Sequence, residues 1–147
     1  MLNRLVTALA ALTVSATPSA LAQAPDSAKK PMMKMEDHAR SGWKELDAFH
    51  LVMMQTWHPA SMRNNLIPIR SRAGELSDKA QLWSKSSFPA PCDTPALREA
   101  VIKAAEQALA LVPLVVSGGD EQVKAALKGV HDTFAIVEKG CKLAKPH

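Results

Sequence analysis

Apolar residues recur at intervals of three and four along most of the chain, the spacing that gathers them on one face of an α-helix. Four stretches carry this pattern, over residues 35–57, 66–86, 95–116 and 120–144. The last is the most regular, and its apolar positions are Val123, Leu127, Val130, Phe134, Val137, Cys141 and Ala144. No stretch alternates apolar and polar residues as a half-buried strand does. The pattern therefore predicts an all-α protein.

Proline and glycine indicate where these helices end. Pro59 lacks a backbone donor and restricts the residue before it, so we expect the first helix to stop at Trp57. Thr94 is placed to cap the third helix, and Gly118 and Gly119 separate the third from the fourth. Four helices of about 20 residues with mostly short connections are typical of an antiparallel up-down-up-down four-helix bundle.

The N-terminus has the features of a secretory signal peptide. Arg4 precedes an apolar run from Leu5 to Val14, and Ala20-Leu21-Ala22 supplies small residues for cleavage. The run is too short to span a bilayer. We expect a signal peptide over residues 1–22, a flexible lead over 23–34 and a bundle over 35–147, which predicts a periplasmic protein.

Charge and hydropathy limit the partners of the mature chain. Removal of Arg4 with the signal leaves 17 basic against 14 acidic residues, a balance that favours solubility. Because an exported protein rarely meets nucleic acid, we expect no nucleic-acid binding. The apolar run from Ala108 to Val116 is short and contains Pro113, so we expect no membrane span. A metal ion is the partner that the sequence suggests. The sequence leaves open whether the protein forms a homodimer.

The two cysteines are predicted to form a disulfide. Cys92 precedes the third helix and Cys141 ends the fourth, and an antiparallel bundle brings these positions to the same end. Exported proteins with two cysteines usually pair them. The alternative is two unpaired thiols, with Cys141 filling a core position.

Histidines and methionines form the candidate site. His50, Met54 and His58 follow one another at intervals of four, and His131 lies beside the apolar stripe of the fourth helix. Imidazole and thioether ligands suit copper, and imidazoles alone suit zinc. The hypothesis is a copper or zinc site between the first and fourth helices, built on His50 and His131. Met53, Met54 or His58 would complete this site, and Asp47 is a supporting partner.

A structural role competes with this hypothesis. Histidines that flank a bundle core are often only hydrogen-bonded, and methionines at helical spacing usually fill the core. A second patch, Met32, Met33, Met35 and His38, offers soft ligands for copper(I) or simply begins a helix. The chain contains neither a phosphate loop nor the Glu-x-x-His repeat of di-iron bundles, and no nucleophile is placed beside a base. We expect that it is not an enzyme.

The signal peptide, the four helices and the stretch from Gly118 to Leu127, with Gly140-Cys141-Lys142 near the end, resemble the cytochrome c prime family of periplasmic bundles. That family attaches haem through Cys-x-x-Cys-His. Here Ala144 replaces the second cysteine and Lys145 the histidine, so the resemblance implies a relative without covalent haem. Noncovalent haem held by His131 and Met53 is the first alternative function, and a structural or interaction module without a ligand is the second.

Overall fold

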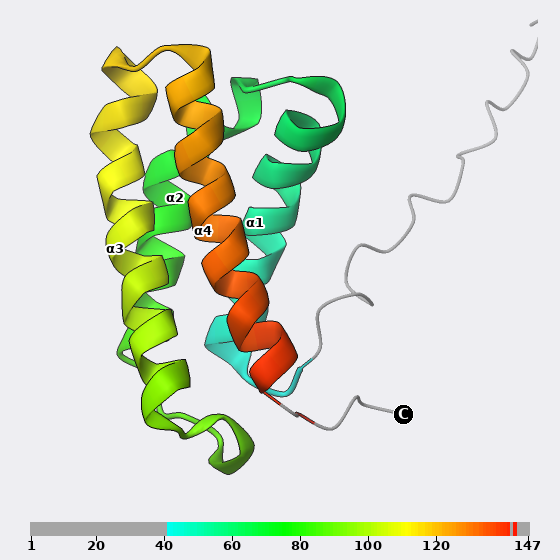
Figure 1. The fold of residues 1–147 in the computed structure, drawn as a ribbon, viewed down its shortest axis with the longest axis vertical. Helices are drawn as coiled ribbons and strands as arrows, with labels where there is room; N and C mark the ends of the chain where they lie inside the picture. Colours follow the sequence, from blue (N-terminus) through cyan, green and yellow to red (C-terminus); the bar gives the residue numbers. More distant parts are fainter. Residues whose placement is uncertain (1–40, 142, 144–147) are drawn as a thin grey trace, which may run out of the picture. The chain divides into compact units, whose positions relative to one another are not determined.

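The computed structural model describes residues 41–141 and residue 143. Its helices are α1 (Lys44–Arg63), α2 (Ile67–Ser84), α3 (Pro95–Ser117) and α4 (Asp120–Gly140), with the short 3₁₀ helix η2 (Ala90–Cys92) before α3. The four long helices pack against one another in a bundle (Figure 1), and these residues contain no strand. The all-α prediction is confirmed. The predicted signal peptide, the lead and residues 35–40 lie outside the described part of the chain.

The buried faces of the helices are the apolar stripes of the sequence. All five predicted core positions of α4 from Val123 to Val137 are buried, and Cys141 follows them into the core. Aromatic rings fill the centre, where Phe49 of α1 stacks on Trp83 of α2 with their centroids 5.0 Å apart. Such rings bury large apolar areas, and this burial is the main force that holds the helices together.

Both predicted bounds of α1 are wrong. The helix begins at Lys44, and residues 41–43, which the prediction included, are not helical. The helix continues through Pro59 to Arg63 and ends at Asn64, whose φ of 51° lies in the left-handed region. Pro59 costs the helix one backbone hydrogen bond. The extra turn, however, places Ala60 in the core with no exposed surface, which helps to offset this loss. His58 consequently lies inside a continuous helix and does not cap its end.

The predicted bounds of the other helices are close to the observed ones, except at the end of α4. The Thr94 hydroxyl accepts a hydrogen bond from the Leu97 N–H at 3.3 Å and caps α3 as expected. α4 stops at Gly140, because Cys141 adopts an extended conformation, with φ −89° and ψ 101°. The prediction that this helix extends past Gly140, to residue 144, is therefore wrong.

Side chains join the ends of different helices. Cys92 and Cys141 lie at disulfide distance, with Cα atoms 4.6 Å apart, so the predicted pairing is confirmed. Trp43, before α1, donates through Nε1 to Ser86 Oγ, after α2, at 2.9 Å.

Two further contacts join helix ends. Arg70, in the first turn of α2, donates to the carbonyls of Val115 and Gly118 at the end of α3. Lys124, near the start of α4, donates to Asn64 Oδ1 at 2.8 Å.

α3 has the length and composition of a membrane-spanning helix, with a mean hydropathy of 1.6 in its most apolar window. The shorter apolar run from Ala108 to Val116 forms its second half. Core helices of globular bundles meet the same criterion, and α3 packs its buried face against α2 and α4. Ile102, Leu109 and Val116 are exposed on its outer face. Length and composition alone thus do not make α3 a membrane span.

Candidate metal centre between α1 and α4

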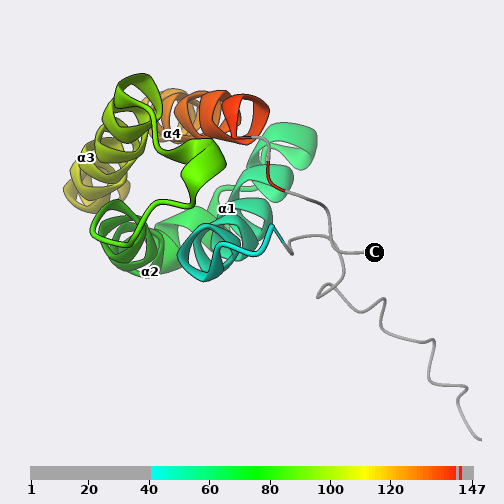
Figure 2. The ribbon, with the colours of Figure 1, turned by 90° about the horizontal axis from the view of Figure 1, so that it is seen from below.

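The predicted site residues lie where α1 faces α4. Figure 2 shows the helices around a common centre, with α1 beside α2 and α4 beside α3. Of the pairs of neighbouring helices, α1 and α4 make the least backbone contact. Side chains therefore fill much of the space between them. We call this region the α1–α4 seam and define it by His50 and Trp57 of α1 with His131, Phe134 and Glu138 of α4.

His50 lies at one position along the length of the seam, which we call the His50 level. Its ring lies against Phe134, with the centroids 4.8 Å apart, and its Nδ1 atom is 3.8 Å from Glu138 Oε1. Only 16% of the His50 side chain is exposed, whereas Glu138 is 47% exposed. An imidazole and a carboxylate from different helices thus face each other at the edge of the core.

Burial lowers the pKa of His50 below its usual 6.5, because the charged imidazolium loses hydration in the seam. The negative charges of Glu138 and Asp47 oppose this shift, and His58 and His131 add to it by repulsion. The net effect is a neutral ring at neutral pH. A neutral imidazole keeps a lone pair that a metal ion or a hydrogen-bond donor can use.

His131 occupies a second level. Its ring stacks on the indole of Trp57, with the centroids 4.5 Å apart and 20° between the planes. Its Nδ1 atom is buried without a hydrogen-bond partner, because the nearest carboxylate oxygen, Asp132 Oδ1, is 3.6 Å away. Asp132 itself pairs with Lys128. The imidazole of His131 is therefore held by stacking, and one third of the side chain is exposed.

The two histidines share the seam but not a level. His50 faces Phe134 and Glu138, whereas His131 faces Trp57, which lies seven residues after His50 on α1. Seven residues correspond to two helical turns, or about 10 Å along the axis. The observed contacts therefore do not bring His50 and His131 around one point.

The other predicted ligands take different positions. His58 is exposed on α1, close enough for its charge to act on His50. Met54 is half-buried, and Met53 is a core residue with 1% exposure. Within residues 41–141 and 143, no three side chains of His, Cys, Asp or Glu are grouped as ready metal ligands.

The sequence patterns did not identify Glu138 as a site residue. Glu138 follows the core residue Val137 directly and is not part of the apolar stripe of α4. A signal was available, because Glu138 lies seven residues after His131 and so on nearly the same face of α4. Only the register between α1 and α4 decides that Glu138, and not His131, meets His50.

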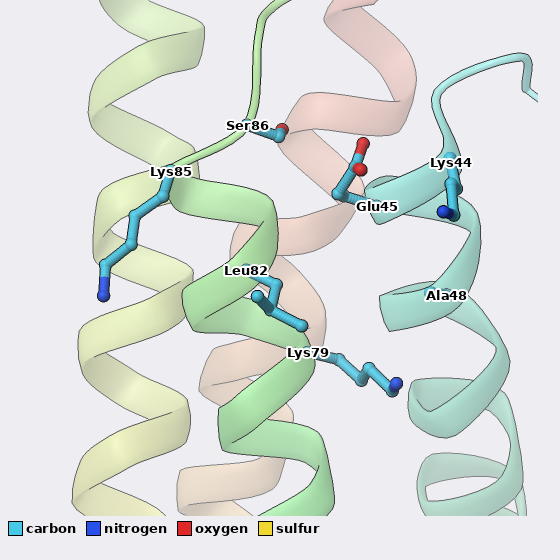
Figure 3. Close-up of a pocket in the computed structure, with 7 residues that line it drawn as sticks. All are labelled: Lys44, Glu45, Ala48, Lys79, Leu82, Lys85 and Ser86. Carbon is cyan, nitrogen blue, oxygen red and sulfur yellow. The ribbon is translucent and has the colours of Figure 1, made fainter.

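A separate depression of about 490 Å³ lies between the start of α1 and the end of α2. It is lined by Lys44, Glu45, Ala48, Lys79, Leu82, Lys85 and Ser86. Figure 3 shows Lys79 directed toward α1 and Lys85 directed away from it, so the lysine side chains do not converge on one point. The depression contains none of the seam residues, and its surroundings do not form an anion site.

Comparison with known proteins does not supply a function. No family model matches the chain, and neither a curated protein nor a solved structure matches it significantly. The function is therefore argued from the chemistry of the α1–α4 seam.

Proposed function

We propose that this protein is an exported, periplasmic four-helix bundle that binds a transition metal ion, copper or zinc, in the α1–α4 seam. It would store, deliver or sense this ion and catalyse no reaction. The observation that supports the proposal is the half-buried imidazole of His50, kept neutral by burial and facing a carboxylate from another helix. Neutral imidazole is the form that binds zinc and copper.

We also propose that the bundle has antiparallel up-down-up-down topology. The contact of Trp43 with Ser86 joins the start of α1 to the end of α2, and that of Arg70 with Val115 joins the start of α2 to the end of α3. The Cys92–Cys141 pair joins the start of α3 to the end of α4. Each of these contacts is the one expected between antiparallel neighbours.

Neighbouring positive charge and burial both favour the uncharged form of His50. His131 and His58 lie within the range at which their charges lower the pKa of His50. Burial already disfavours the protonated form of His50. Binding of copper or zinc would therefore need little additional free energy to deprotonate this ligand. The partly exposed Glu138 leaves the His50 level accessible from solvent.

The first experiment is metal analysis of untagged protein from a periplasmic extract, by elemental mass spectrometry and an absorption spectrum of the same sample. We expect close to one copper or zinc ion per chain, and its loss in His50→Ala. Lys103→Ala, an exposed change on α3, is the control and should keep the ion. Protein that is metal-free and does not bind added Zn²⁺ or Cu⁺ would overturn the proposal.

The same spectrum tests the alternative of noncovalent haem, which would give a Soret band. The described geometry offers it little support, since the proposed ligand Met53 is buried in the core and His131 is stacked on Trp57. A colourless, metal-free protein that also does not bind added Zn²⁺ or Cu⁺ would favour the second alternative, a structural or interaction module.

A further inference from the structure

The contact between His50 and Glu138 has the dimensions of a ligand pair. Around a tetrahedral zinc ion, nitrogen and oxygen ligands lie about 2.1 Å from the metal, which separates them by about 3.4 Å. His50 Nδ1 and Glu138 Oε1 are 3.8 Å apart. This separation exceeds a hydrogen bond but needs only a small side-chain movement to enclose an ion.

The two helices hold these groups in different ways. His50 is fixed on one side by the ring of Phe134, which limits the orientations of the imidazole. Glu138 lies in the last turn of α4, two residues before Gly140, and the Cys92–Cys141 pair anchors the chain that follows. A restrained imidazole therefore faces a carboxylate that can adjust to an ion at the edge of the core.

The donor atoms determine which ion fits. Imidazole nitrogen and carboxylate oxygen are common zinc ligands, whereas Cu⁺ prefers the soft sulfur of methionine or cysteine. Both cysteines are paired with each other, and Met53 is enclosed in the core. The half-buried Met54, one turn after His50, is then a single thioether against one nitrogen and one oxygen donor. Asp47, one turn before His50, adds negative charge to this level of the seam, which further favours a divalent cation.

We propose that Glu138 is a metal ligand together with His50, and that this pair makes the seam select Zn²⁺ over Cu⁺. The inference rests on the function proposed above and assigns its metal. Water molecules complete the coordination, and a site with so few protein ligands exchanges its ion readily. Such exchange suits delivery or sensing better than storage.

The test compares Zn²⁺ and Cu⁺ binding by full-length wild-type protein and Glu138→Gln, using competition with a chromogenic chelator. We expect the wild type to bind Zn²⁺ more tightly than Cu⁺, and Glu138→Gln to lose Zn²⁺ affinity by about tenfold or more with Cu⁺ affinity unchanged. Glu99→Gln removes the same charge from an exposed position on α3 and should bind as the wild type does.

Thermal unfolding gives a second measurement. Glu138→Gln should unfold like the wild type without metal, because Glu138 is half exposed, but it should lose the increase in Tm that Zn²⁺ produces. Wild-type Zn²⁺ affinity in Glu138→Gln, or equal losses in Glu138→Gln and Glu99→Gln, would overturn the ligand assignment and leave metal binding in place. Tighter Cu⁺ than Zn²⁺ binding by the wild type would overturn the selectivity. A wild type that binds neither ion would overturn the proposed function itself.

Discussion

The imidazole of His131 lies nearly flat on the indole of Trp57, with 4.5 Å between the ring centroids and 20° between the planes. This stack joins α4 to α1 two turns away from the contact of His50 with Glu138. It gives His131 a role in helix packing that needs no metal. The same stack keeps its ring away from the level of His50, so the two histidines serve different parts of the seam.

The stack should be measurable as a coupling between its two members. In a double-mutant cycle with Trp57→Leu and His131→Leu, we expect a coupling of about 1 kcal/mol in the free energy of unfolding, the usual order for an aromatic pair. Urea unfolding of metal-free protein measures it. Trp57→Leu combined with Ile136→Ala, an exposed change on α4, is the control and should be additive. A coupling near zero in the first cycle would show that the rings do not support each other.

The stability of the metal-free protein should fall in acid because of His50. Its pKa is lowered below 6.5 in the folded state, mainly by burial, so the unfolded chain takes up the proton first as the pH falls. The contribution of His50 is therefore present in full above pH 6.5 and is lost as the pH drops through the lower folded pKa. Glu138 and Asp47 reduce this effect, and His58 and His131 increase it.

The measurement is the free energy of unfolding from about pH 8 to about pH 5 in the presence of a chelator. His50→Gln should lose less stability than the wild type over this interval, because it removes the titrating group and keeps a polar side chain. Lys103→Gln, at an exposed position on α3 and not among the groups that act on His50, is the control and should keep the pH dependence of the wild type. Equal pH dependence of His50→Gln and the wild type would contradict the prediction.

Removal of the Cys92–Cys141 pair should destabilise the bundle. The two residues are 49 positions apart. Closing a loop of this length lowers the entropy of the unfolded chain and so raises its free energy by about 4 kcal/mol at 25 °C. The double variant Cys92→Ser/Cys141→Ser should lose a free energy of unfolding of this order in urea. A wild type reduced with dithiothreitol should behave like the variant. Unchanged stability in both samples would show that the pair is not bonded in solution.

Two helical glycines should respond to alanine in opposite ways. A Cβ atom at Gly74, in α2, meets nothing within 4 Å, so Gly74→Ala should stabilise the protein by about 0.5–1 kcal/mol through the lower entropy of the unfolded chain. A Cβ atom at Gly140 would lie 2.8 Å from Leu97 Cδ2, and Leu97 is buried in the core with little room to move aside, so Gly140→Ala should destabilise the protein. Thermal unfolding of both variants in one buffer measures the contrast. Equal shifts in the same direction would contradict the prediction.

Much of the fold follows from local patterns. The spacing of apolar residues identified the buried face of α4 from Val123 to Val137, and Thr94 marked the start of α3. The prediction that α1 ends before Pro59 was wrong, because local rules treat proline as a helix end. They cannot weigh its lost hydrogen bond against the burial of Ala60 one residue later.

The sequence by itself determined four helical stretches, apart from the bounds of α1 and the end of α4, the apolar face of each helix, and that two cysteines could meet at one end of a bundle. It also identified the imidazoles of His50 and His131 as candidate metal ligands. Only the tertiary structure decided that His50 meets Glu138 while His131 meets Trp57. Helical periodicity fixes the face on which a side chain lies, but the axial register of α1 against α4 depends on how Phe49, Trp83 and Phe134 pack in the core between them. That packing is a property of all the helices together, and no local pattern encodes it.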